Sequence, residues 1–114
     1  MTRPNRRNLM LGALCLPLAT GFAASAEAMM RVFKSPTCGC CTAWVDHMIR
    51  AGVSADVRDI DDDRLWALKM QSGLKPEMTG CHTAFIDGYV VEGHVPATDV
   101  LRLLTERPDA IGLA

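Results

Sequence analysis

The dipeptide Asp87-Gly88 lies between two short apolar runs, "TAFI" before it and "YVVE" after it. Asp-Gly is a typical two-residue hairpin turn, because the type I′ conformation needs positive φ at both positions. The pattern therefore predicts two antiparallel strands whose register is set by the turn. Counting outward along these strands pairs Cys81 with His94, so the two side chains are expected at the same end of the hairpin.

Strand and helix patterns alternate along the rest of the chain. Short apolar runs predict two more strands, and apolar residues at helical spacing predict three helices. The strands are expected at 29–33 and 53–60, and the helices from Cys41 up to Gly52, from Asp61 up to Gly73 and from Pro96 to Glu106. This order (βαβαββα) predicts a thioredoxin-like α/β domain, with a mixed sheet and helices on both faces. The helical spacing also assigns Trp44 and Trp66 to the core.

The N-terminal segment, residues 1–28, has the pattern of a cleaved export signal. Arginines at positions 3, 6 and 7 precede the apolar run "LMLGALCLPLATGFAA", and "SAEA" supplies the small residues of a cleavage site ending at Ala28. The paired arginines also fit the twin-arginine route, which exports folded proteins. We therefore expect an exported single domain, residues 29–114, without a stable membrane anchor.

The charge balance of the predicted mature chain bears on its partners. Removing residues 1–28 leaves nine Lys and Arg against twelve Asp and Glu, a net charge of −3. Nucleic-acid binding needs clustered cations that neutralise phosphates, so no nucleic-acid partner is expected. The remaining 86 of the 114 residues form a domain with only a small core, so a bound metal or a disulfide would add to its stability.

Three cysteines, Cys38, Cys40 and Cys41, fall within four residues at the start of the first predicted helix. Free amide groups and the helix dipole favour anions there, so these thiols are expected to be good nucleophiles and metal ligands. Cys38 and Cys41 have the C-x-x-C spacing shared by redox and metal sites. A dithiol enzyme does not need the additional thiol of Cys40, which therefore favours a site for a soft metal. The alternative is a structural disulfide framework, for which four cysteines allow three pairings.

The thioredoxin-like arrangement brings the end of the hairpin beside the start of the first helix. The predicted metal site therefore combines four thiols with two imidazoles at its rim: Cys38, Cys40, Cys41, Cys81, His82 and His94. Four thiolates suit Cu(I), and bridging sulfurs could hold more than one copper ion. Zinc is the alternative metal, because it also accepts thiolate ligands.

Two segments, "FKSPTCGCCTAWVDHM" and "CHTAFIDGYVVEGHVPATDVLRLL", resemble the CopG-like copper-resistance proteins, a bacterial group of exported metal-binding domains with a thioredoxin-like fold. The resemblance covers most of residues 31–113. It implies a periplasmic protein that binds copper through its clustered cysteines, contributes to copper tolerance and meets other periplasmic copper-handling proteins. By matching motif, the four cysteines named above are the implied ligands, with His82 and His94 as neighbouring functional positions.

Two other functions fit the same residues. Cys38 and Cys41 would serve a thiol-disulfide oxidoreductase, and copper and dithiol chemistry can share one set of thiols. Such an enzyme normally has a cis-proline just before its third strand, where this chain has Cys81-His82 and where Pro76 comes too early. A zinc-stabilised structural module is the other alternative. Exposed thiols at a helix end also leave open whether the protein is a monomer or a metal-bridged dimer.

Overall fold

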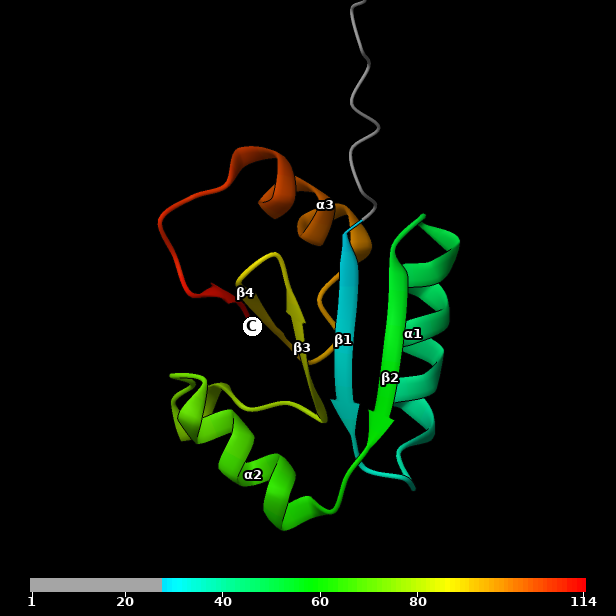
Figure 1. The fold of residues 1–114 in the computed structure, drawn as a ribbon, viewed down its shortest axis with the longest axis vertical. Coiled ribbons are helices and arrows are strands. Elements are labelled where there is room, and N and C mark those ends of the chain that lie inside the picture. The colour runs from blue at the N-terminus through cyan, green and yellow to red at the C-terminus, as the bar shows by residue number, and fades with distance from the viewer. Residues whose placement is uncertain (1–27) are drawn as a thin grey trace, which may run out of the picture.

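The computed structural model describes residues 28–114, so the predicted export signal lies outside the described residues except for Ala28. Within this range, strands and helices alternate as the sequence predicts (Figure 1). The strands are β1 (Met29–Lys34), β2 (Ser54–Asp59), β3 (His82–Ile86), β4 (Tyr89–Glu92) and β5 (Gly112–Leu113). The helices are α1 (Gly39–Arg50), α2 (Asp62–Gln71) and α3 (Ala97–Glu106), and a short 3-10 helix, η1 (Pro76–Met78), precedes β3.

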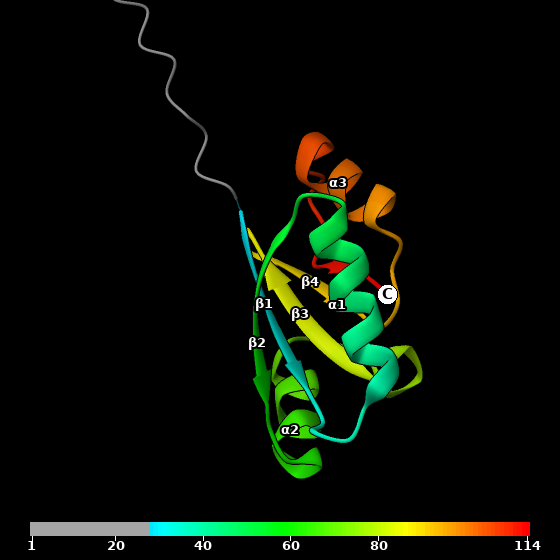
Figure 2. The same ribbon diagram turned by 90° about the vertical axis from the view of Figure 1, so that its right-hand side faces the viewer.

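The strands form one mixed sheet in the order β2-β1-β3-β4-β5. β1 pairs with β2 and β4 with β5 in parallel, whereas β3 is antiparallel to both of its neighbours. Alternate residues of each strand face opposite sides of the sheet, so each side needs its own cover. α1 and α3 cover one face and α2 lies against the other, as Figures 1 and 2 show from two directions. The predicted α/β class, with a mixed sheet and helices on both faces, is confirmed.

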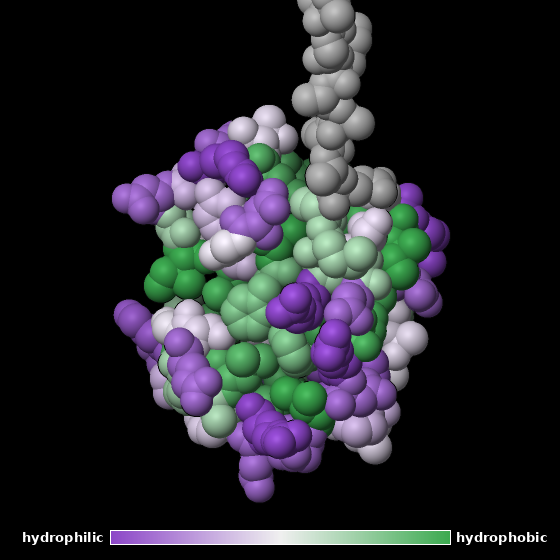
Figure 3. Space-filling model, viewed as in Figure 1, coloured by the Kyte–Doolittle hydropathy of each residue, from purple (hydrophilic) through white to green (hydrophobic). Residues whose placement is uncertain are grey.

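The main hydrophobic core lies between the sheet and the helices α1 and α3. Burial of apolar surface there is the main favourable contribution to folding. Its largest fully buried apolar side chains are Met30, Met48, Ile86, Val32, Val91 and Val100. The opposite face is only partly covered by α2. Phe33 and Phe85 meet there edge to face with ring centroids 5.9 Å apart, and Figure 3 shows apolar surface in the middle of this view.

The hairpin has the predicted turn and register. Asp87 and Gly88 both have positive φ, 48° and 84°, as a type I′ turn requires. Thr83 lies opposite Glu92 in the ladder. Beyond the last paired residues, the Gly93 amide donates to the carbonyl oxygen of His82 over 3.1 Å, which carries the pairing toward the end of the hairpin.

Two features of the fold differ from the sequence analysis. Trp66 was assigned to the core, but it is 48% exposed on α2, whose short buried stripe contains Leu65 and Lys69 instead. The short strand β5 was not predicted. It lies so close to β4 that a Cβ on Gly112 would come within 1.6 Å of the Val90 carbonyl oxygen, so only glycine fits. Among residues 28–114, no helix is long and apolar enough to cross a membrane.

Candidate metal centre

The cysteine triplet lies at the N-terminus of α1. Cys38 and Cys41 form a disulfide, with Cα atoms 5.5 Å apart, and the Cys40 sulfur lies 3.4 Å from that of Cys38. Cys41 is buried against the core, whereas Cys40 is exposed to solvent. Cys38 is the N-cap residue but makes no side-chain cap, and the first turn of α1 contains no acidic residue. The free amides of this helix end are therefore available to favour thiolates.

Cys81 and His94 reach the same place from the hairpin. Cys81 directly precedes β3, and His94 follows β4 after Gly93. The sulfurs of Cys40 and Cys81 and a ring nitrogen of His94 all lie within 4.8 Å of one another, and all three side chains are exposed. A hydrogen bond with Cys40 raises the pKa of the Cys81 thiol, with burial and the Cys40 charge acting in the same direction. The structure thus brings Cys81 and the helix-end cysteines together, although their role as metal ligands stays a prediction.

His82 lies deeper than the sequence analysis placed it. The prediction put His82 on the rim, but it is fully buried because alternate residues of β3 point toward α1. Its ring lies between Trp44, with centroids 4.3 Å apart, and His94, at 5.5 Å. Burial, aided by the neighbouring charge of His94, lowers the pKa of His82 from 6.5 to about 4. Neither ring nitrogen has a hydrogen-bond partner among the described residues, so this neutral imidazole keeps a free lone pair inside the site.

Two side chains of α1 form hydrogen bonds with the segment that follows His94. The indole Nε1 of Trp44 donates to the carbonyl oxygen of Val95 over 2.8 Å. Two residues further along the chain, the Ala97 amide at the start of α3 donates a hydrogen bond to Nε2 of His47 over 3.1 Å. His47 is exposed, and nothing in the sequence indicates this contact between two distant segments. The chain that follows His94 is therefore held by α1 at Val95 and again at Ala97.

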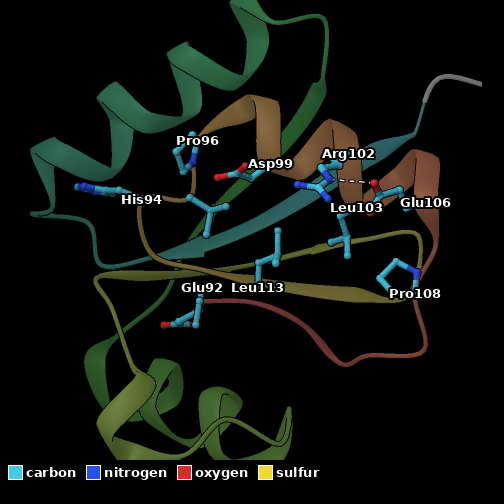
Figure 4. Close-up of a pocket in the computed structure, with 11 residues that line it drawn as sticks. Glu92, His94, Pro96, Asp99, Arg102, Leu103, Glu106, Pro108 and Leu113 are labelled. Carbon is cyan, nitrogen blue, oxygen red and sulfur yellow. Dashed lines mark hydrogen bonds and ion pairs between the residues drawn. The ribbon is translucent and has the colours of Figure 1, made fainter.

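Two surface hollows border the site. A shallow groove of about 420 Å³ runs past Cys40, Trp44, His47 and His94. A second pocket of about 460 Å³ lies between α3 and the β4–β5 edge (Figure 4), where Arg102 and Glu106 form an ion pair. His94 lines this pocket too, but no thiol does. We therefore place the candidate site at the cysteines and treat the groove as its open side.

The donor set suits a soft metal ion. With the Cys38–Cys41 disulfide closed, Cys40, Cys81 and His94 offer two thiols and one imidazole. Reduction of the disulfide would add two more sulfurs at the same helix end. Thiolates select Cu(I) and zinc, whereas oxygen ligands suit harder ions such as calcium and magnesium. The residues present therefore fit copper by their chemistry.

Comparison with known proteins identifies the family of this chain. Two solved structures, described as "Copper resistance protein copG", Forms 1 and 2, are each 38% identical to the chain and each match 76% of it. The matches cover 67% and 68% of those chains, with TM-scores of 0.69 and 0.68. A family model described as "Protein of unknown function, DUF411" matches residues 78–114. A search of curated proteins found no match. Identity at this level over this share of both chains reflects common descent, and the protein belongs to the CopG-like family of copper-resistance proteins.

Proposed function

We propose that this protein is exported to the periplasm, binds Cu(I) through its clustered cysteines and contributes to copper resistance. Copper-resistance relatives support the link to copper, and the sulfur-rich donor set supports the cuprous ion. The observation that carries the proposal is the meeting of Cys40, Cys81 and His94. Cys40 comes from the N-terminus of α1, and Cys81 and His94 come from the two sides of the hairpin, yet their ligand atoms lie within 4.8 Å of one another.

Exposure of the donors favours a cargo ion over a structural one. A structural zinc site is closed by four protein ligands. Cys40, Cys81 and His94 are all exposed, which suits an ion that is taken up and passed on. Zinc remains the alternative metal, and competition between Zn²⁺ and Cu(I) for the reduced protein separates the two.

The same exposure supports exchange of copper with other periplasmic copper-handling proteins. The groove beside Cys40 and His94 leaves the donors open to an incoming ligand. Cys40 belongs to both groups of clustered donors, so its sulfur could bridge two copper ions. It could likewise bridge two chains through metal, and size-exclusion chromatography with and without copper distinguishes a monomer from such a dimer.

The test is a Cu(I) titration of reduced residues 29–114 without oxygen, in competition with a coloured Cu(I) chelator. Because Cys40 is shared by both donor groups, Cys40→Ser should lower the Cu(I) affinity more than any other single cysteine change. Thr42→Ser, an exposed change in the same helical turn, is the matched control and should leave the affinity unchanged. Equal affinities of wild type and Cys40→Ser would refute the proposal.

A second candidate function is thiol-disulfide exchange. The observation that favours it is the Cys38–Cys41 disulfide at a helix N-terminus, where thiol pKa values fall and the leaving thiolate is stabilised. Insulin reduction tests it: Cys38→Ser should abolish any activity, whereas Cys40→Ser should retain it. If Cys38→Ser abolishes insulin reduction while Cys40→Ser leaves both insulin reduction and copper binding intact, the oxidoreductase is the better assignment.

A further inference from the structure

A cluster of buried polar side chains lies on the α2 face of the sheet, outside the donor set. Lys69 of α2 is 4% exposed, Thr83 of β3 is 0% exposed and Glu92 of β4 is 2% exposed. The Lys69 ammonium donates to Thr83 Oγ1 at 2.9 Å and forms an ion pair with Glu92 Oε1. Thr83 Oγ1 in turn donates to Glu92 Oε2 over 2.8 Å. The three side chains therefore hold the Glu92 carboxylate in one orientation.

Stability alone gives little reason for this cluster. Removing two charges from water costs several kcal/mol for each ion, and the attraction between them often only offsets that cost. Apolar residues of similar volume are frequently as stable or more so. The cluster therefore points to a requirement for the carboxylate itself at this position.

The carboxylate makes one further contact, which leads to the metal centre. Glu92 Oε1 accepts a hydrogen bond from the backbone amide of Gly80 over 3.0 Å. Gly80 directly precedes Cys81 in the chain. The buried acceptor thus fixes the backbone from which the Cys81 sulfur projects toward Cys40.

Close backbone packing reinforces this contact. A Cβ on Gly80 would lie 2.8 Å from the Cα of Gly93, so the two glycines pack directly against each other. The next residue after each glycine is a donor of the candidate site, Cys81 in one case and His94 in the other. Any outward movement of the Gly80 backbone would therefore separate the two donors.

We propose that Glu92, held by Lys69 and Thr83, is a positioning residue of the metal centre that keeps the Cys81 sulfur beside Cys40 and His94. The inference rests on the proposed copper function and deepens it. Groups behind metal ligands typically change metal affinity by about 10- to 100-fold when removed. An effect of this size is expected from loss of the Gly80 contact.

Two double variants test the role of the carboxylate oxygen. Lys69→Met/Glu92→Gln and Lys69→Met/Glu92→Leu both remove the buried charges, but only the Gln variant keeps an oxygen for the Gly80 amide. In chelator competition, the Leu variant should bind Cu(I) about 10- to 100-fold more weakly, and the Gln variant should bind like wild type. Circular dichroism and thermal melts confirm that the compared proteins are folded. Equal Cu(I) affinities in all three folded proteins would overturn the proposal.

The milder variant Thr83→Val covers the case in which the Leu variant fails to fold. It removes the donor to Glu92 Oε2 while leaving the ion pair. The carboxylate then loses its fixed orientation, and the Cu(I) affinity should fall severalfold. An unchanged affinity in folded Thr83→Val overturns the proposal.

A copper-free readout separates this inference from the proposed function. Phenylarsine oxide bridges two neighbouring thiols, forming two As–S bonds while its oxygen leaves as water with both thiol protons. With the Cys38–Cys41 disulfide closed, the arsenical should bridge Cys40 and Cys81 in wild type and in the Gln variant, and should bridge them much less in the Leu variant. If wild type binds the arsenical in this pattern but does not bind Cu(I), the copper function fails and the positioning role stands. Equal arsenical binding by all three folded proteins refutes the positioning role.

Discussion

Trp44 donates its indole N–H to the carbonyl oxygen of Val95 across 2.8 Å and so joins α1 to the loop that carries His94. Trp44→Phe would keep an aromatic ring against His82 but leave this carbonyl without its donor. We expect the free energy of unfolding to fall by about 1–3 kcal/mol, the cost of a buried unsatisfied group. Urea denaturation measures it, with Trp66→Phe as the matched control because Trp66 is 48% exposed. Equal losses in the two variants would contradict the assigned role of the Val95 contact.

Closing or opening the disulfide should change how much copper binds. Residues 29–114 contain two free thiols when Cys38 and Cys41 are joined and four after reduction. We expect the reduced protein to bind more Cu(I), or to bind it more tightly, because two sulfurs are added at the same helix end. Thiol titration and copper analysis of the two forms measure this. Identical copper content and affinity would exclude Cys38 and Cys41 as ligands.

His94 and His47 offer a matched pair of histidines beside the groove. Both line it, but only His94 belongs to a group of clustered donors, whereas Nε2 of His47 accepts from the Ala97 amide. Cu(I) should therefore shift the imidazole NMR signals of His94 and leave those of His47 nearly unchanged. His94→Gln should weaken Cu(I) binding, and His47→Gln should not. A silent His94 would remove it from the ligand set.

The metal-free protein should lose stability in mild acid because of His82. Its pKa is lowered to about 4 by burial, with His94 and Lys69 adding unfavourable positive charge, while an unfolded histidine has a pKa near 6.5. Between these values the unfolded chain binds more protons than the folded one. Stability is thus fully present above pH ~6.5 and falls as the pH drops toward about 4, by up to about 3 kcal/mol.

Urea denaturation at several pH values between 7 and 4 tests this dependence. His82→Phe keeps a ring between Trp44 and His94 but cannot be protonated, so its stability should fall less over the same range. The carboxylates are common to both proteins, so their contribution cancels in the comparison. Parallel pH profiles would show that His82 does not control this loss.

The local chemistry of a few residues was sufficient to predict much of the fold. Asp87-Gly88 determined the turn, and the observed pairing of Thr83 with Glu92 follows from it. That register also puts Cys81 and His94 at one end of the hairpin. The cysteine triplet was recognisable because three thiols at a helix start have few structural reasons to occur together.

Other features depend on tertiary contacts that carry no local pattern. His82 was expected on the rim because the ladder count gave its position along the strand, whereas the side of the sheet it faces depends on α1. Lys69 and Glu92 look like solvated surface charges in the sequence, because nothing local reveals that α2 packs over β4. Trp66 was assigned to the core from helical spacing, yet α2 has too narrow a buried stripe to enclose it.

α1 begins without any capping side chain and without an acidic residue in its first turn. A helix end of this kind lacks a partner for its positive pole until anionic sulfur gathers there. Binding of a metal ion by these thiolates would therefore stabilise the first turn of the helix as well as occupy the site. Amide hydrogen exchange at the positions just after Cys38 should therefore be slower in the metal-bound protein than in the metal-free protein.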